Sequence, residues 1–265
     1  MKFTTVSTVR ASSQPAVVIE DRVHTLPYAD MRAVITAGAE KAASRASKES
    51  LSLDEVQFHS PIDPGTLRDA YAFETHVKTA NRNRGQDVPE NWYKFPVFYF
   101  SNPNNNYGHE DVIPYPAYTQ AMDYELEIAV VIGREAKDLS ADEAMDAVFG
   151  YVAFNDISAR GLGRTGINSF LGKSFDTFAT FGPWIVTKDE IPDPQSLNIT
   201  VDVNGERRQD YSTSDMERPI PELLTYISSV TALHPGDVIC CGTNHQGLGS
   251  VRIRMRDFDG PEEFL

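Results

Sequence analysis

The chain has 265 residues, which is the length of one large domain or two small ones. Apolar residues make up 41% of it and charged residues 23%, which is typical of a globular protein. With 24 basic against 38 acidic residues the formal net charge is -14, which argues against binding to nucleic acid or to an anionic membrane surface. An anionic substrate would therefore need local positive charge, from a metal ion or from individual Lys and Arg side chains.

The chain holds two cysteines, Cys240 and Cys241, which are adjacent in an apolar run. Neighbouring cysteines rarely bridge each other, so we interpret them as small buried side chains and expect a reducing compartment. No stretch approaches the roughly 18 consecutive apolar residues of a membrane span. The first residues lack the apolar core of a signal peptide, so the cytoplasm is the expected location.

The first part of the chain is predicted to contain a β-hairpin followed by a helix. Residues 16–26 read as the hairpin, with Glu20 and Asp21 near its turn. Residues 29–46 have apolar side chains at helical spacing, although Gly38 within this run weakens the helix.

Three further helices are predicted. Residues 67–80 have a helical pattern, and residues 219–229 open with prolines and continue as an apolar stripe. A short helix is expected at 140–148, because Ser140 followed three positions later by Glu143 is a capping box.

The rest of the chain is dominated by strands. Asn204-Gly205 is the strongest short-range hairpin signal. Predicted strands lie at residues 97–100, 151–158, 181–187 and 197–203, and residues 233–242 are predicted to be a turn into a buried strand. The chain does not alternate strand and helix as a doubly wound fold does, so the fold class is predicted to be α+β with a large, mostly β core.

A boundary is predicted near residue 60, because residues 59–66 are rich in loop-forming types. We therefore expect a small N-terminal α/β-hairpin region at residues 1–60. The domain that carries the chemistry would span residues 61–265.

The segment Asp123-Tyr124-Glu125-Leu126-Glu127 opens a strongly apolar run. In a strand, residues two apart point to the same face, so Glu125 and Glu127 would aim at one spot. Adjacent carboxylates on a half-buried face repel each other unless something positive lies between them, and a hard divalent cation is the simplest such group. Taken alone, such a pair is more often the solvated end of a strand at the rim of a sheet.

Asp156 lies among apolar residues of the next predicted strand, where an acid is costly unless it is paired or binds a metal. Three carboxylates from two strands suit Mg²⁺, Mn²⁺ or Ca²⁺ better than zinc, because no Cys or His lies at ligand spacing beside them. Lys173, which follows Gly172, is a candidate charge for an anionic intermediate or else a solvated loop side chain. Glycines at 242–249 could let backbone N–H groups approach a ligand.

Seven segments together resemble, in order, the fumarylacetoacetate hydrolase family over about residues 95–250. They are Asp123–Gly133, Phe149–Arg160, Gly172–Phe178, Gly182–Trp184, Val203–Glu206, Pro235–Ile239 and Gly242–Thr243. The resemblance implies a mixed β-sandwich roll of the type found in the C-terminal domain of this family. It also implies a homodimer that holds one Mg²⁺ or a similar cation.

Carried onto this chain, the resemblance implies metal ligands, catalytic groups and substrate contacts. Glu125, Glu127 and Asp156 would bind the metal, and Lys173 would stabilise enolate character. Arg160 and Thr243 would contact the substrate. These assignments come from the match of each position to the family's motifs.

An earlier segment has the spacing found in the larger hydrolases of the family. There, an Asp ligand precedes the catalytic His by seven residues, with a Tyr two positions after the Asp. Asp69, Tyr71 and His76 match this spacing, so the resemblance implies a fourth ligand, a substrate contact and the base. The smaller decarboxylase-type members use a His and a Glu three residues on, where this chain has Thr79. A His on a surface helix is the plainer interpretation of His76.

The chain also departs from the family pattern. Asn102 stands where many members carry a Lys ahead of the metal-binding strand. Arg160 or Arg164 could take over the contact of that Lys with the substrate, or the substrate differs. Residues 251–256 show no obvious counterpart of the acid that orients the His in the larger hydrolases, and the family's last turn and strands look abbreviated before Leu265.

These residues predict Mg²⁺-dependent hydrolysis of a carbon–carbon bond in a small anionic 1,3-diketo acid, such as an acylpyruvate. His76 would activate a water molecule, while Lys173 and the metal would stabilise the enolate that leaves. A decarboxylase or keto–enol isomerase of a related 2-keto acid is an alternative, and a metal-binding relative without activity is another. The aromatic residues between Trp92 and Tyr107 suggest a partly apolar pocket, or core or dimer contacts.

Overall fold

The computed structural model describes residues 1–9, 11–82, 85–119, 122–160, 170–244 and 252–253. Its strands are β1 Lys2–Thr8, β2 Ala11–Ile19, β3 Arg22–Thr25, β4 Leu51–Ser52, β5 Gln57–His59, β6 Leu67–Ala70, β7 Phe98–Ser101, β8 Met122–Asp123, β9 Leu126–Ile132, β10 Val148–Asp156, β11 Ser158–Ala159, β12 Ala179–Phe181, β13 Ile185–Thr187, β14 Asn198–Val203, β15 Glu206–Ser212, β16 Val238–Cys240 and β17 Arg252–Ile253. Its α-helices are α1 Met31–Ala37, α2 Ala39–Ala43, α3 Glu74–Arg82, α4 Ala141–Ala144 and α5 Ile220–Val230.

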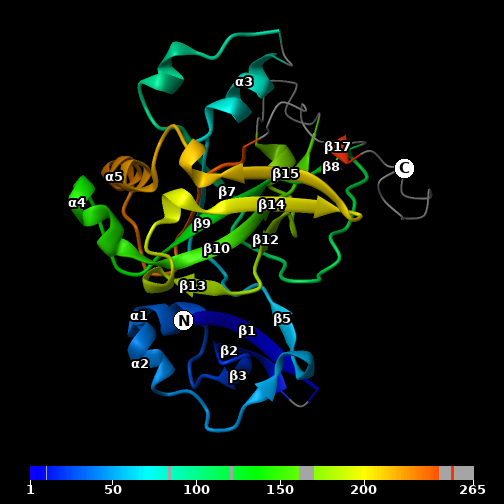
Figure 1. Cartoon of the computed structure of the whole chain (residues 1–265), viewed down its shortest axis with the longest axis vertical. Helices are drawn as coiled ribbons and strands as arrows, with labels where there is room; N and C mark the ends of the chain where they lie inside the picture. Colours follow the sequence, from blue (N-terminus) through cyan, green and yellow to red (C-terminus); the bar gives the residue numbers. More distant parts are fainter. Residues whose placement is uncertain (10, 83–84, 120–121, 161–169, 245–251, 254–265) are drawn as a thin grey trace.

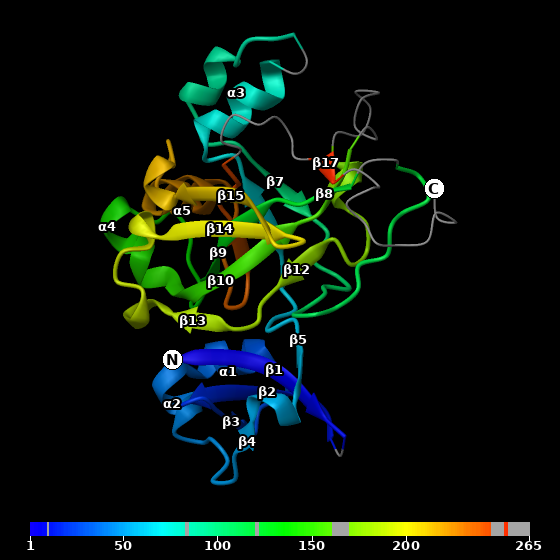
Figure 2. The same cartoon turned by 45° about the vertical axis from the view of Figure 1, so that its right-hand side comes forward.

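One sheet of twelve strands runs through the described part of the chain. Its strand order is β4-β3-β2-β1-β13-β10-β9-β16-β6-β7, with β5 beside β1 and β12 beside β10. Two smaller sheets, β11-β8-β17 and β14-β15, also form. The first strands lie at the bottom of the molecule, whereas α3 lies at the top (Figures 1 and 2). The large sheet and its helices agree with the predicted α+β class.

The central strands separate two hydrophobic cores, because alternate residues point to opposite faces of a sheet. On β9, Ile128, Val130 and Ile132 belong to the first core, whereas Ala129 and Val131 belong to the second. Helix α5 packs on the first core and α1 on the second. A strand buried on both faces has no polar side of its own, which is why β9 reads as a continuous apolar run.

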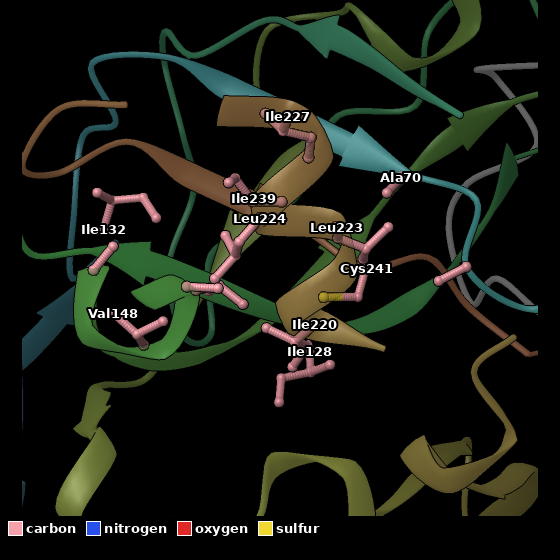
Figure 3. Close-up of a cluster of buried hydrophobic side chains, with 14 of the residues drawn as sticks. Ala70, Ile128, Ile132, Val148, Ile220, Leu223, Leu224, Ile227, Ile239 and Cys241 are labelled. Carbon is pink, nitrogen blue, oxygen red and sulfur yellow. The ribbon is translucent and has the colours of Figure 1, made fainter. Parts of the chain in front are cut away.

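Helix α5 forms where residues 219–229 predicted it. Its buried residues recur at helical spacing, and Figure 3 shows them directed at the strands beneath. The residues of this contact are Ile220, Leu223, Leu224 and Ile227 on the helix, with Ile128 and Ile239 among the strand residues below. Helix α5 thus covers one face of the sheet. The acidic residues of the candidate site lie on the opposite face.

The predicted hairpin and helix of the first 60 residues are present. Strands β2 and β3 pair with Val18 opposite Val23, and Glu20 and Asp21 form the turn with positive φ. The helix predicted at 29–46 is divided into α1 and α2 at Gly38, whose φ is +86°. That left-handed conformation suits glycine and ends the first helix.

The N-terminal strands continue the main sheet rather than forming a separate one. Strand β1 pairs antiparallel with β13, with Lys2 opposite Val186. Phe3 is fully buried in the second core, and its ring lies 5.6 Å from that of Phe149. The predicted boundary at residue 60 therefore stays a prediction. The residues on either side of it share one hydrophobic core.

Two further predicted elements differ in the structure. The helix predicted at 67–80 is wrong in its first half, since residues 67–70 form β6 and α3 begins only at Glu74. Every residue of β6 is buried between β16 and β7, so pairing within the sheet overrides the local helical pattern. The single strand predicted at 181–187 is two short strands, β12 and β13, separated around the cis peptide between Gly182 and Pro183.

Several local predictions are confirmed. Ser140 and Glu143 form the capping box of α4, and Asn204-Gly205 turns β14 into β15. Cys240 and Cys241 are buried and free. Among the described residues, the structure contains no helix with the length and apolar character needed to cross a membrane.

Candidate metal centre and active site

Three acids predicted as metal ligands lie on the same face of the main sheet. They sit on β6, β9 and β10, in each case two positions from an apolar residue. These apolar residues all belong to the second core and are Leu67, Ala129 and Phe154. Because residues two apart share a face, the acids continue the face of that core at one end of the sheet.

The register of the strands brings these acids together. Strand β16 pairs in parallel with β6, which places Cys240 opposite Asp69, and it pairs antiparallel with β9. Strand β10 places Phe154 opposite Glu127, so Asp156 follows two residues later. One carboxylate oxygen from each of Asp69, Glu127 and Asp156 lies within 4.8 Å of the other two, and all three side chains are buried.

Glu125 is also buried but takes part in ion pairs instead of this group of three. Lys173 Nζ donates to Glu125 Oε2 at 2.7 Å and also donates to Asp156. The guanidinium group of Arg160 donates a hydrogen bond to Glu125 and a second one, from Nε, to Asp123 Oδ2 at 2.8 Å. The four predicted ligands are therefore neighbours, with Lys173 between Glu125 and Asp156.

The burial of this cluster shifts the pKa values of its members. Burial raises the pKa of Asp69 and of Glu127 well above their usual values, and nearby carboxylates add to both shifts. Burial also raises the pKa of Asp156, although Lys173 opposes this rise. Burial alone would lower the pKa of Lys173, but the charges of Asp156 and Glu125 outweigh it and raise that pKa well above the usual value.

The cluster has the charge and the donor atoms that a hard divalent cation requires. The cluster contains five buried carboxylates and two cationic side chains, those of Lys173 and Arg160. When all seven groups are ionised, three negative charges are not balanced. Such an excess of negative charge away from water is costly unless a cation offsets it. Oxygen atoms at this spacing suit Mg²⁺, Mn²⁺ or Ca²⁺. The residues present therefore fit a divalent metal ion.

A small pocket of about 10 Å³ adjoins the acids, which is room for one water molecule or ion. It brings together seven of the nine residues predicted for the site. They are Asp69, Tyr71, His76, Glu125, Glu127, Lys173 and Thr243. His76 comes from the start of α3, and its ring lies 6.0 Å from that of Tyr71. Burial raises the pKa of Tyr71 to about 12, so its hydroxyl stays protonated.

The residues after β16 also line this pocket. The backbone N–H of Gly242 donates to Glu127 Oε2 at 2.7 Å. Gly242 has a φ of +87°, and a Cβ there would lie 2.5 Å from the carbonyl oxygen of Ala70, so only glycine fits. Thr243 is buried, and its Oγ1 accepts a hydrogen bond from Gln209 Nε2 at 3.2 Å.

Two residues of the site were not predicted from the sequence. Tyr99 donates from its hydroxyl to Asp69, and also to Asp156 Oδ2 at 3.3 Å. It does so because β7 pairs with β6 and places Tyr99 opposite Asp69. Gln209, which holds Thr243, lies on β15. The aromatic strand around Tyr99 was a usable signal, whereas nothing in the local sequence marks Gln209.

The departures from the family pattern have a partial structural answer. Asn102 donates from Nδ2 to the carbonyl oxygen of Ser174 at 3.2 Å and to Asp176 Oδ1 at 3.1 Å, so it holds the segment that follows Lys173. Arg160 is bound to two carboxylates, and its predicted contact with the substrate stays a prediction. Arg164 and most of residues 251–256 lie outside the described residues.

The sequence also matches a known protein family. The model of the fumarylacetoacetate (FAA) hydrolase C-terminal domain matches residues 66–265. This match covers well over half of the chain, so the chain belongs to the fumarylacetoacetate hydrolase family. The predicted fold type is thereby confirmed, and the strands β6 to β17 all fall within the matched residues.

Named relatives include enzymes that act as tautomerases. Oxaloacetate tautomerase YisK of Bacillus subtilis is 38% identical over 195 residues, which are 72% of this chain and 63% of that protein. The mitochondrial oxaloacetate tautomerase FAHD2B of Bos taurus is 41% identical over 204 residues, which are 76% of this chain and 63% of that protein. The chain thus spans about 63% of the length of these two curated relatives.

Solved structures have the same fold. The fumarylacetoacetate hydrolase of the psychrophile Exiguobacterium antarcticum is 31% identical and superposes with a TM-score of 0.76. That superposition covers 92% of this chain and 86% of the other. The chain is therefore similar both to a protein named a hydrolase and to proteins named tautomerases.

Proposed function

We propose that this chain is a divalent-metal-dependent hydrolase that cleaves a carbon–carbon bond in a 1,3-diketo acid, such as an acylpyruvate. The observation that carries the proposal is the small pocket lined by His76, Lys173 and three buried carboxylates, those of Asp69, Glu125 and Glu127. A base, a cation and a site for a metal ion are the three groups that this hydrolysis uses.

Asp69, Glu127 and Asp156 would hold the metal ion, with Glu125 beside them. A bound divalent cation would act as a Lewis acid on the keto–enolate oxygens of the substrate. Mg²⁺ is the proposed ion, and Mn²⁺ or Ca²⁺ would also suit an all-oxygen donor set. The homodimer and the cytoplasmic location expected from the family and from the composition stay predictions.

The side chains of the pocket would carry the proton and charge transfers. His76 takes a proton from a water molecule, whose oxygen attacks the distal carbonyl carbon. The bond between that carbon and the methylene carbon then breaks, which leaves a carboxylate and the enolate of a 2-keto acid. Lys173 stabilises the enolate oxygen with its ammonium group, and a proton from His76 restores the neutral methyl ketone. The balance is one substrate and one water giving two acids.

A tautomerase is the second candidate, and the names of the two curated relatives favour it. A keto–enol tautomerase binds a 2-keto acid in the same way as the hydrolase, but it needs no water molecule to attack the substrate. A decarboxylase is less favoured, because the position three residues after His76 is the buried Thr79, which cannot act as a carboxylic acid.

Product analysis separates these reactions. The protein would be assayed with Mg²⁺ and with Mn²⁺ against acylpyruvates, fumarylpyruvate-type compounds and oxaloacetate. We expect two organic acids in equal amounts from an acylpyruvate, with consumption of water shown by ¹⁸O in the new carboxylate. A changed keto–enol ratio of oxaloacetate without cleavage of any diketo acid would instead establish the tautomerase. Release of CO₂ would establish the decarboxylase, and no reaction at all would leave only metal binding.

Substitutions test the division of roles between ligand and base. Glu127→Gln should lose both bound metal and turnover, because it removes a charged oxygen ligand. His76→Ala should keep the metal and lose turnover by at least about a hundredfold. Metal content by elemental analysis and turnover by product formation are the measurements. Equal loss of metal in the two variants would overturn the assignment.

A further inference from the structure

A second and larger pocket lies directly beside the first. It has a volume of about 570 Å³, which is within the usual range for pockets that bind small molecules. Its walls come from α3, from the segment 89–98 that contains the short helix η2 Glu90–Tyr93, and from Tyr226 of α5. Helix α3 and that segment lie together at the top of the molecule in Figures 1 and 2.

Tyr71 connects the two pockets, because its side chain lines both. In the small pocket Tyr71 lies together with the carboxylates of Asp69 and Glu125, so its side chain is next to them. The backbone N–H of Tyr71 donates to the carbonyl oxygen of Val97 at 3.1 Å, which ties the larger pocket to β6. A molecule held at the carboxylates could therefore extend past Tyr71 into the larger pocket.

The larger pocket is apolar and holds no charged side chain among the described residues that line it. Its apolar lining includes Val77, Trp92, Phe95, Val97 and Phe98, and its polar groups include two amides, Asn81 and Asn91. Phe95 and Val97 are 56% and 40% exposed, so apolar surface of this pocket is open to a ligand. A ligand group that covers them would remove apolar surface from water, whereas a carboxylate placed here would meet no charged side chain among the described lining residues.

We infer that the larger pocket binds the distal end of the substrate, and that this end is an uncharged apolar or aromatic group. The preferred substrate is then a diketo acid with one carboxylate, at the metal end, rather than a dicarboxylate. This inference rests on the proposed function, because it assumes that the 2-keto acid end of the substrate lies at the carboxylates.

Binding of three 2-keto acids that lack a cleavable bond tests the inference without turnover. The Mn²⁺-loaded protein would be titrated calorimetrically with 2-oxobutanoate, 4-phenyl-2-oxobutanoate and 2-oxoadipate. These have the same keto acid head and end in a methyl group, a phenyl group and a carboxylate. We expect the phenyl compound to bind at least about tenfold more tightly than 2-oxobutanoate, because the pocket buries the ring. The dicarboxylate should gain nothing.

Variants locate the effect. Phe95→Ala and Val97→Ser alter exposed pocket residues and leave the cores intact, and each should reduce the advantage of the phenyl compound to about threefold or less. Phe100→Ala is the matched control, since Phe100 is 52% exposed, lies close in sequence and does not line the pocket. This control should keep the tenfold advantage. Circular dichroism confirms that each variant is folded.

The possible outcomes separate this inference from the proposed function. If 2-oxobutanoate binds but the phenyl group adds nothing, the inference is overturned and the proposed function survives. If none of the three compounds binds, the protein does not bind a 2-keto acid at this site, and both the inference and the proposed function are overturned. If the phenyl advantage persists unchanged in both Phe95→Ala and Val97→Ser, the ring lies elsewhere and the assignment of this pocket is wrong.

Discussion

At the scale of single residues, the site depends on how much negative charge the fold holds away from water. Asp69, Glu127 and Asp156 are each at most 3% exposed, and each has a raised pKa. The hydroxyl of Tyr99 and the ammonium of Lys173 offset part of this charge. The remainder would give the site affinity for a cation, because a metal ion would replace protons on groups that otherwise resist ionisation.

We predict that stabilisation by the metal increases with pH. Carboxyls whose pKa is higher in the folded than in the unfolded chain stabilise the metal-free fold at low pH, and this contribution is lost as pH rises through the raised values. A divalent ion then competes with fewer protons, so the thermal shift with Mg²⁺ or Mn²⁺ should be larger at about pH 8 than at about pH 5.5. Thermal denaturation with and without EDTA measures it. A shift of equal size at both pH values would contradict the prediction.

At the scale of elements, the parallel pairing of β16 with β6 positions the site. It brings the residues after β16 against those after β6, where Gly242 donates to Glu127 and approaches the carbonyl oxygen of Ala70. The sequence marks this segment as glycine-containing but does not identify its neighbour. This pairing joins residues about 170 positions apart, so it is a property of the tertiary structure. The local pattern of residues 67–80 predicts a helix where β6 forms.

Gly242→Ala should therefore damage both stability and metal binding. The new Cβ meets backbone at 2.5 Å in a left-handed conformation, so we expect a loss of about 2–4 kcal/mol in the free energy of unfolding and weaker metal binding. Gly205→Ala is the matched control, because Gly205 has a φ of +79° in the β14–β15 turn with nothing within 4 Å. It should cost about 1 kcal/mol and leave metal affinity unchanged. Equal effects in the two variants would show that the close contact has no role.

At the scale of the whole molecule, one sheet joins the first 60 residues to the rest. The pairing of β1 with β13 and the burial of Phe3 against Phe149 place both parts around the second core. The acids lie on the same face of the sheet as this core. The N-terminal region thus supports the sheet that carries the site, although it contributes none of the predicted site residues.

Phe3→Ala should destabilise the protein as one unit. Removing a fully buried aromatic ring from a shared core costs about 3–5 kcal/mol, and we expect a single cooperative transition at lower denaturant concentration. Unfolding followed by tryptophan fluorescence and by circular dichroism should coincide. Val9→Ala, at a fully exposed position, is the control and should change little. Two separate transitions in Phe3→Ala would show instead that the first 60 residues unfold independently.

The sequence by itself determined the family and the α+β class, and it pointed to seven of the residues that line the small pocket. Glu127 and Asp156 could be predicted because each acid interrupts an apolar strand, and that conflict is visible locally. Hairpins and caps were also predictable, since Asn204-Gly205 and Ser140 with Glu143 act within a few residues. These features share a short range along the chain.

Only the tertiary structure decided which groups meet. It brought Asp69 of β6 close to Glu127 of β9, although β16 lies between these strands. It also placed the hydroxyl of Tyr99 where it donates to Asp69, and directed Glu125 towards Lys173 and Arg160. It also placed an apolar pocket behind Tyr71. The physical reason is that strand order and register join residues far apart in sequence, and no local pattern encodes them.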